Sequence, residues 1–110
     1  MLQYYAKKSF NEDPQLVKEP PMERAWVYGA RVTDTELARV AEQYSLDAGI
    51  LRDVRDVNEL PRVEYNQGSA YVFIRAPHQT SRGSIVTTPF LAVIKGTLLI
   101  TLSTKDYPLP

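Results

Sequence analysis

The side chains that most often transfer protons or attack a substrate are sparse in this sequence and occur in no arrangement that would use them. His78 is the single histidine, and it follows Pro77 in a polar loop-like stretch with Gln79 and Thr80. A general base needs an oriented partner and a substrate proton within reach. No serine lies in a nucleophile-elbow context, and Gly83 has no lysine or second glycine at phosphate-loop spacing. The sequence therefore predicts a protein that is not an enzyme.

Two aspartates carry the one arrangement with metal-binding potential. Asp53 and Asp56 lie three residues apart in "LRDVRDV", so on a helix they share a face. Two carboxylates and water can hold a hard divalent ion. Arg52 and Arg55 interleave with them, and alternating charges on a helix usually form a solvated face with weak ion pairs. The residues alone favour the solvated face and leave a metal role open.

The charge balance argues against nucleic acid and membrane surfaces as partners. Thirteen basic and thirteen acidic residues cancel among 110 residues. Nucleic acid needs a basic face, and a membrane surface attracts polybasic runs. The longest strongly apolar stretch, 89–102, is shorter than the roughly 20 residues that a spanning helix requires. We expect one domain over residues 1–110. The absence of cysteine suits the cytosol and excludes disulfides and cysteine–zinc sites.

Two strands are predicted in the first third of the chain. Residues 2–6 form a short one, and the apolar run 24–32 forms a buried one rich in β-formers. Trp26, near the start of that run, is expected in the core. The polar stretch 7–24 contains three prolines and shows no period, so we interpret it as an extended surface segment.

A helical region follows. Thr33 and Glu36 have capping-box spacing, and an apolar stripe at helical period continues from them. Asp47 is predicted to cap a second, shorter helix, and Pro61 ends any helical continuation. The predicted inner positions of the two helices are Leu37, Val40, Ala41, Tyr44, Ile50, Leu51 and Val54.

The remainder of the chain is predicted to be β. In 62–65 apolar and charged residues alternate, so this strand should have one wet face. A tight turn at 66–68 leads into 69–76, which is apolar on both faces and is expected to be covered on two sides. Residues 85–103 form a further strand pair with its turn at Lys95-Gly96. The predicted order β-β-α-α-β-β-β-β is that of an α/β fold, a mixed sheet with helices packed on it.

Read together, these segments resemble the N-terminal cytoplasmic domain of CorA-type magnesium channels over about residues 24–103. The family pattern has a tryptophan-led strand, a helix opened by Thr or Asp, an "R-P-K-V-E" linker, a "Y-x-F-I-V-L" strand and a hairpin with Lys-Asn, where this chain has Lys95-Gly96. The matching positions are Trp26, Leu37, Tyr44, Leu46, Leu51, Asp53, Pro61, Arg62, Val63, Glu64, Tyr65, Tyr71, Phe73 and Ile74.

The resemblance implies a CorA-like α/β/α sandwich that acts as the regulatory or funnel domain of a divalent-cation transporter, on the cytoplasmic side of the cell membrane. It implies neighbouring subunits of a homo-oligomer as partners, a pentamer at full length, with no nucleic acid and no membrane contact by this chain itself. In members of the family that sense ions, the matching aspartate faces an acidic group of the adjacent subunit, and magnesium bridges the two in the closed channel. The resemblance thus makes Asp53 the metal candidate. No cofactor is implied for the isolated domain, and Mg²⁺ is implied at a subunit interface at full length.

Two departures from the family pattern affect these expectations. Arg52 stands where the family often has glutamate, and its cation is expected to weaken an ion at Asp53 by repulsion. The stalk helix, the membrane helices and the Gly-Met-Asn pore motif do not occur in these 110 residues, and the exit segment "TKDYPLP" favours a chain cut at a domain boundary. The alternative is a stand-alone protein-interaction module that binds through a sheet edge or the Lys7–Arg24 segment.

Overall fold

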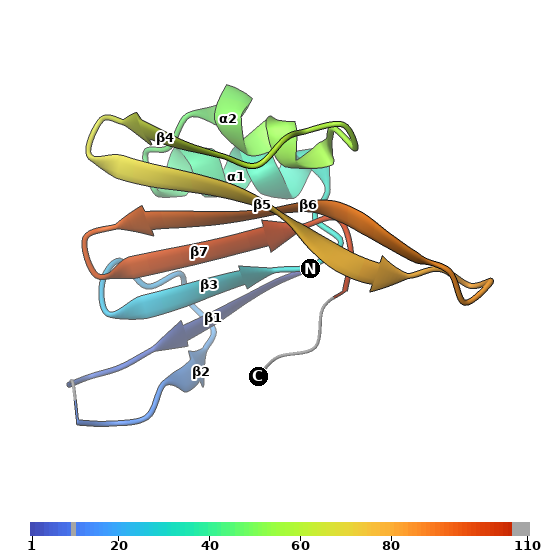
Figure 1. Cartoon of the computed structure of the whole chain (residues 1–110). Coiled ribbons are helices and arrows are strands. Elements are labelled where there is room, and N and C mark those ends of the chain that lie inside the picture. Colours follow the sequence, from blue (N-terminus) through green and yellow to red (C-terminus); the bar gives the residue numbers. More distant parts are fainter. Residues whose placement is uncertain (10, 107–110) are drawn as a thin grey trace.

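The computed structural model describes residues 1–9 and 11–106, which form one mixed sheet with a helical layer (Figure 1). The last residues of the predicted exit segment, 107–110, lie outside the described residues. The strands are β1 (Leu2–Ala6), β2 (Gln15–Val17), β3 (Ala25–Gly29), β4 (Arg62–Asn66), β5 (Ser69–Gln79), β6 (Ile85–Lys95) and β7 (Leu98–Ser103). The helices α1 (Asp34–Gln43) and α2 (Ala48–Arg52), and the 3₁₀ turn η1 (Asp53–Arg55), lie between β3 and β4.

The seven strands are ordered β2-β1-β3-β7-β6-β5-β4. β3 and β7 run parallel, and the other neighbouring pairs are antiparallel. The predicted mixed sheet with helices packed on it is confirmed, but the predicted element order was short by one strand. Residues 15–17, expected to be extended surface chain, form β2 because they pair with β1, with Leu16 opposite Tyr5. Three residues within a polar stretch are too few to give a strand signal of their own, so only this pairing defines β2.

The helical region follows the sequence closely. The Thr33 hydroxyl accepts a hydrogen bond from the Glu36 amide at 3.1 Å, and the Glu36 carboxylate accepts one from the Thr33 amide at 3.0 Å, which completes the capping box. The Asp47 carboxylate accepts from the Ile50 amide at 2.9 Å and caps α2. The buried Tyr71 hydroxyl accepts from the Asp47 amide at 3.1 Å. This last bond ties the start of α2 to β5, the strand next to the edge strand β4.

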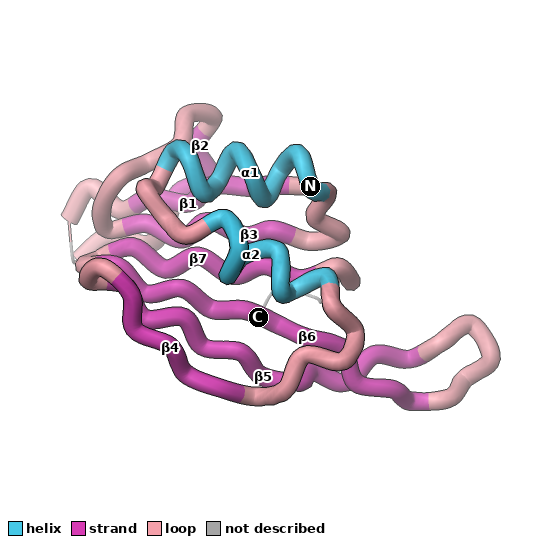
Figure 2. The backbone as a smooth tube through the Cα atoms, turned by 90° about the horizontal axis from the view of Figure 1, so that it is seen from above, coloured by secondary structure: helices cyan, strands magenta, loops and turns pink. Residues whose placement is uncertain are grey.

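The core lies between the helices and one face of the sheet. Figure 2 shows α1 and α2 over the same face, and the main apolar cluster joins their inner residues to alternate residues of the strands. Tyr71 and Phe73 of β5 belong to this cluster, whereas Ile74 is exposed on the other side. The expectation that β5 is covered on two sides is therefore wrong for the described residues. The described residues supply two of the three layers of the α/β/α sandwich that the resemblance implied, namely one helical layer and the sheet.

We call the opposite side of the sheet the open face, and define it by Leu16, Tyr5, Trp26, Leu99, Ile94, Ala70 and Tyr65. Apolar and charged residues alternate in β4 as predicted, but the apolar residues lie on the exposed face and the charged ones on the more buried face. Val63 and Tyr65 are exposed, while the charged Arg62 and Glu64 are partly buried towards the helices. Trp26, expected in the core, is likewise half-buried on the open face. The period indicates which residues share a face, but not which face the helices cover.

The β5–β6 hairpin extends beyond the rest of the sheet and forms the projection in Figure 1. His78 lies in this projection, in β5 and opposite Val86, rather than in the loop that the sequence predicted. Strand pairing with residues of β6 extends the ladder past Pro77. Among the described residues, no helix is long and apolar enough to cross a membrane.

Candidate metal site at Asp53

Asp53 lies where the helical layer ends and turns back towards the sheet. It caps α2 and begins η1, and its amide donates to the Ile50 and Leu51 carbonyls. Its side chain is 42% exposed. A carboxylate in this position is held by rigid backbone and remains accessible to an ion or to a second protein surface.

The cation that pairs with Asp53 is Arg62, at the start of β4. Arg62 Nη2 donates to Asp53 Oδ2 at 2.8 Å, and Arg62 Nη1 lies 2.9 Å from Glu59 Oε1. The guanidinium also stands over the Phe73 ring, with its central carbon 4.6 Å from the ring centroid. The hydrogen bond to Asp53, partly opposed by burial, raises the pKa of Arg62 above its ordinary value. One guanidinium thus bridges two carboxylates, and this cluster carries one net negative charge.

Arg52 was expected to be the cation beside the aspartate, but the residue bonded to Asp53 lies nine positions further along the chain. The bond forms because the loop that contains Pro61 brings Arg62, at the start of β4, back to Asp53. Sequence analysis missed this pair. The available signal was Arg62 in the linker pattern, at the start of a strand whose charged residues share one face.

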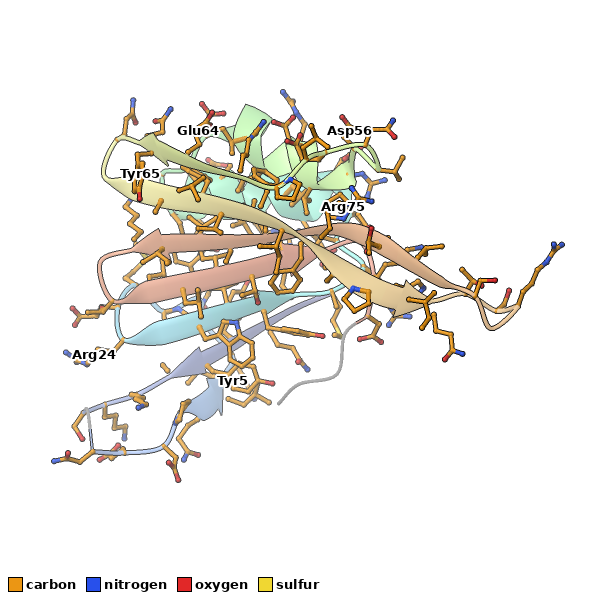
Figure 3. The ribbon with its side chains drawn as sticks, viewed as in Figure 1. Tyr5, Arg24, Asp56, Glu64, Tyr65 and Arg75 are labelled. Atoms are coloured by element: carbon orange, nitrogen blue, oxygen red, sulfur yellow. The ribbon has the colours of Figure 1, made fainter. Side chains whose placement is uncertain are left out.

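Asp56 does not join Asp53 in a two-carboxylate site. The helix is interrupted by the 3₁₀ turn, and Asp56 follows it, where its carboxylate accepts from the Asn58 amide at 3.0 Å and closes a local turn. Figure 3 shows Asp56 in the loop beyond the helices. The described residues contain no group of three or more His, Cys, Asp or Glu side chains that could hold a metal ion. Among the described residues, Asp53 therefore provides only part of a metal site.

Arg55, the other cation of the predicted solvated face, turns towards α1 instead. Its Nε lies 2.9 Å from Asp34 Oδ1, and its Nη1 donates to the Val32 carbonyl at 2.7 Å. These contacts fasten η1 to the start of α1. The charge alternation in "LRDVRDV" thus produces tertiary contacts rather than a simple row of neighbouring ion pairs.

His78, the single histidine, and Asp53, the metal candidate, lie on different elements: the projecting hairpin and the end of α2. A cavity of about 290 Å³ lies elsewhere, lined by Tyr5, Trp26 and Leu99 among others, and includes neither residue. The arrangement around Asp53 can bind a cation or a partner surface, and it offers no oriented base and nucleophile.

Comparison with solved structures identifies the fold. The chain superposes on the CorA magnesium transporter of Methanocaldococcus jannaschii with a TM-score of 0.78 and 21% identity, over 97% of this chain and 33% of that one. The soluble domain of CorA from the same organism gives 0.76 and 22%, over 96% and 41%. The cytoplasmic domain of ZntB from Vibrio parahaemolyticus gives 0.73 and 7%, over 96% and 44%.

The fold is that of the cytoplasmic domains of CorA and ZntB, so the resemblance drawn from the sequence is confirmed at the level of the fold. The chain spans 33% to 44% of the length of these solved chains. No protein-family model matches the sequence, and no curated protein does either. The likeness is therefore carried by three-dimensional structure.

Proposed function

We propose that this chain is the regulatory or funnel domain of a CorA-like divalent-cation transporter, located on the cytoplasmic side of the membrane, and that it performs no catalysis. The observation that supports this most directly is the match to CorA and ZntB cytoplasmic domains over at least 96% of the chain. The placement of Asp53 outside any acid–base arrangement agrees with a binding role.

The proposed regulatory site is shared between subunits of a homo-oligomer. Mg²⁺ prefers six oxygen ligands in near-octahedral geometry and usually keeps several waters, with one or two carboxylates from protein. Asp53 provides one exposed carboxylate, and an acidic side chain of a neighbouring subunit would provide the other. An ion that binds only when the two subunits are apposed stabilises that arrangement by its differential affinity for it. Cation-dependent gating of the assembly follows from this half-site.

The test uses the complete reading frame from which the chain derives. We expect it to continue past codon 110 into membrane helices and to support Mg²⁺ uptake in cells that lack their own magnesium transporters. Asp53→Ala should weaken the inhibition of uptake by internal Mg²⁺, while Asp56→Ala, which removes a carboxylate already used in a turn, should not. A frame that ends at Pro110, or uptake whose inhibition is unchanged in Asp53→Ala, would contradict the proposal.

The alternative, a protein-interaction module, is favoured by a different observation. The edge strands β2 and β4 each expose a large side chain, Leu16 and Tyr65. Full activity in cells of a natural chain ending at Pro110 would support this alternative, because a chain without membrane segments does not conduct ions.

A further inference from the structure

Strand β4 forms one outer edge of the sheet. All of its residues pair with β5, and no other strand of the described residues lies on its second side. Figure 2 shows β4 at the margin of the sheet, and Figure 3 shows Glu64 and Tyr65 on this strand. An edge strand carries a row of backbone N–H and C=O groups without a partner, and such a row can accept a further strand.

The register of β4 identifies these unpaired backbone groups. The two-residue turn at 67–68 has positive φ at both positions, so the flanking residues Asn66 and Ser69 form a hydrogen-bonded pair. Hydrogen-bonded and non-hydrogen-bonded pairs alternate along an antiparallel ladder. Val63 and Tyr65 therefore turn their N–H and C=O groups away from β5, and the described residues provide no other backbone partner for them.

The edge is formed before any partner binds. At one end of β4, Arg62 is bonded to Asp53 and Glu59 and stands over the Phe73 ring. At the other end, the tight turn at 67–68 fixes the strand to β5. Because β4 is held at both ends, only the incoming strand has to be ordered on binding, which lowers the entropic cost of association.

The charged side chains of β4 lie on the helix side of this edge. Arg62 and Glu64 are half-buried there, and Glu64 forms no ion pair among the described residues. The pKa of Arg62 is raised first by its hydrogen bond to Asp53 and, more weakly, by the nearby charges of Glu59 and Glu64. Three carboxylates and one guanidinium leave two net negative charges beside the edge.

These features define the chemistry of a strand that would fit. Side chains of an added strand alternate between the two sides of the sheet, as those of β4 do. A lysine or arginine opposite Glu64 would pair with its carboxylate. Apolar residues would fit opposite Val63 and Tyr65, whose side chains are 56% and 81% exposed. A second copy of β4 fits less well, because its Arg62 is already paired and two acidic clusters would meet.

We propose that the edge of β4 binds an extended segment of a partner protein in which a basic residue lies between two apolar residues. The segment extends the sheet through the backbone of Val63 and Tyr65, and its basic side chain pairs with Glu64. The added strand lies in the plane of the sheet, so the site does not require the open face to be uncovered. This interaction goes beyond the proposed transport function and depends on neither metal binding nor uptake.

Hydrogen exchange followed by NMR tests the edge. In the free chain, the amides of Val63 and Tyr65 should exchange rapidly and that of Glu64 slowly, because only Glu64 donates to β5. The probe is a cyclic β-hairpin peptide whose outer strand reads Thr-Val-Lys-Val-Thr, since a pre-formed strand binds at a lower entropic cost. The peptide should slow the exchange of the Val63 and Tyr65 amides and shift their signals, and the Glu64 amide should remain slow.

Exchanging charges tests the recognition. Glutamate in place of the lysine of the peptide should weaken binding about 30-fold, because an attraction between unit charges becomes a repulsion. Glu64→Lys should reverse this preference, and Glu64→Gln should weaken binding of the lysine peptide if Glu64→Lys does not fold.

Removing a backbone donor tests the added strand directly. Val63→Pro deletes an outward N–H while leaving the ladder to β5 intact, so it should weaken binding about tenfold. Val63→Thr, which keeps the donor, is the matched control and should leave binding unchanged.

Slow exchange of the Val63 and Tyr65 amides in the free chain would overturn the proposal. Equal binding of the lysine and glutamate peptides, shifts confined to other strands, or no protection of these two amides by the lysine peptide would overturn it as well. Protection that appears only as the chain itself is concentrated would assign the edge to a second copy instead.

Discussion

Replacing Arg62 with glutamine is expected to convert Asp53 from an occupied ion-pair partner into a measurable magnesium ligand. In the native chain, Arg62 Nη2 lies 2.8 Å from the Asp53 carboxylate. An ion bound at Asp53 must either displace the Arg62 guanidinium or bind beside it against charge repulsion. The other carboxylate of this cluster, Glu59, is also paired with Arg62, so the described residues of the site offer no second free carboxylate. We therefore expect the native chain to show no Asp53-dependent Mg²⁺ binding below about 1 mM, because Mg²⁺ dehydrates reluctantly for a single carboxylate.

The size of the change follows from the charges. Both side chains are more than a third exposed, at 36% for Arg62 and 42% for Asp53, so a water-like dielectric applies. Two unit charges about 4 Å apart then interact by about 1 kcal/mol, and a divalent ion beside the guanidinium is opposed by about 2 kcal/mol. This corresponds to roughly a 30-fold gain in affinity for Arg62→Gln. Arg52→Gln, which removes a cation with no bond to Asp53, should give a smaller gain.

The assay is a Mg²⁺ titration followed by the amide NMR signals of residues 50–56, with Asp53→Asn/Arg62→Gln as the control that should remove the response. The dispersion of the spectrum reports whether each variant remains folded, since Arg62 also packs on Phe73. Sub-millimolar, Asp53-dependent binding by the native chain would refute the half-site argument. A larger gain from Arg52→Gln than from Arg62→Gln would refute the role of the observed ion pair.

Three stability predictions follow from other contacts, each measured by urea unfolding. Arg75 donates four hydrogen bonds, to β6 and to the loop after η1, so Arg75→Met should cost about 2 kcal/mol, whereas Arg82→Met in the hairpin loop should change stability by less than about 0.5 kcal/mol. Thr33→Ala removes the capping box and should cost about 1 kcal/mol, while Thr35→Ala, inside the first turn, should not. Burial, reinforced by a neighbouring tyrosine, raises the pKa of Tyr44 to about 12. Because this lies above the unfolded value of about 10, stability should be full below pH ~10 and fall as the pH rises towards 12, and Tyr44→Phe should remove that fall. If Tyr44→Phe still loses stability between about pH 10 and 12, the role of the Tyr44 hydroxyl is contradicted. If Arg75→Met costs no more stability than Arg82→Met, or Thr33→Ala no more than Thr35→Ala, the contact of Arg75 or of Thr33 is contradicted.

Features that depend on neighbours in the chain were predictable. The capping box at Thr33, the cap at Asp47 and the turn after β4 each arise from interactions over a few residues. In that turn, Gln67 and Gly68 both adopt positive φ, as a two-residue hairpin loop requires. The mixed α/β class followed from the same short-range periods.

The candidate site was predictable only in part. The resemblance selected Asp53, and the structure places that carboxylate at the surface. Its partner Arg62 and the separation of Asp56 were not predictable, because they depend on the interruption of the helix at η1 and the return of β4. The metal role of Asp53 remains a prediction for the titration and uptake experiments.

The remaining features of the fold arise from contacts between distant residues. The sequence alone determines that Val63 and Tyr65 share a face, because side chains alternate along a strand. The tertiary structure decides that this face is the open one, because α1 and α2 pack on Phe73 and its neighbours across the other side. The tertiary structure also decides that residues 15–17 form β2 and that Trp26 pairs with Leu99 in parallel strands. Local patterns define the faces of each element, and packing over long sequence distances selects which of them is buried.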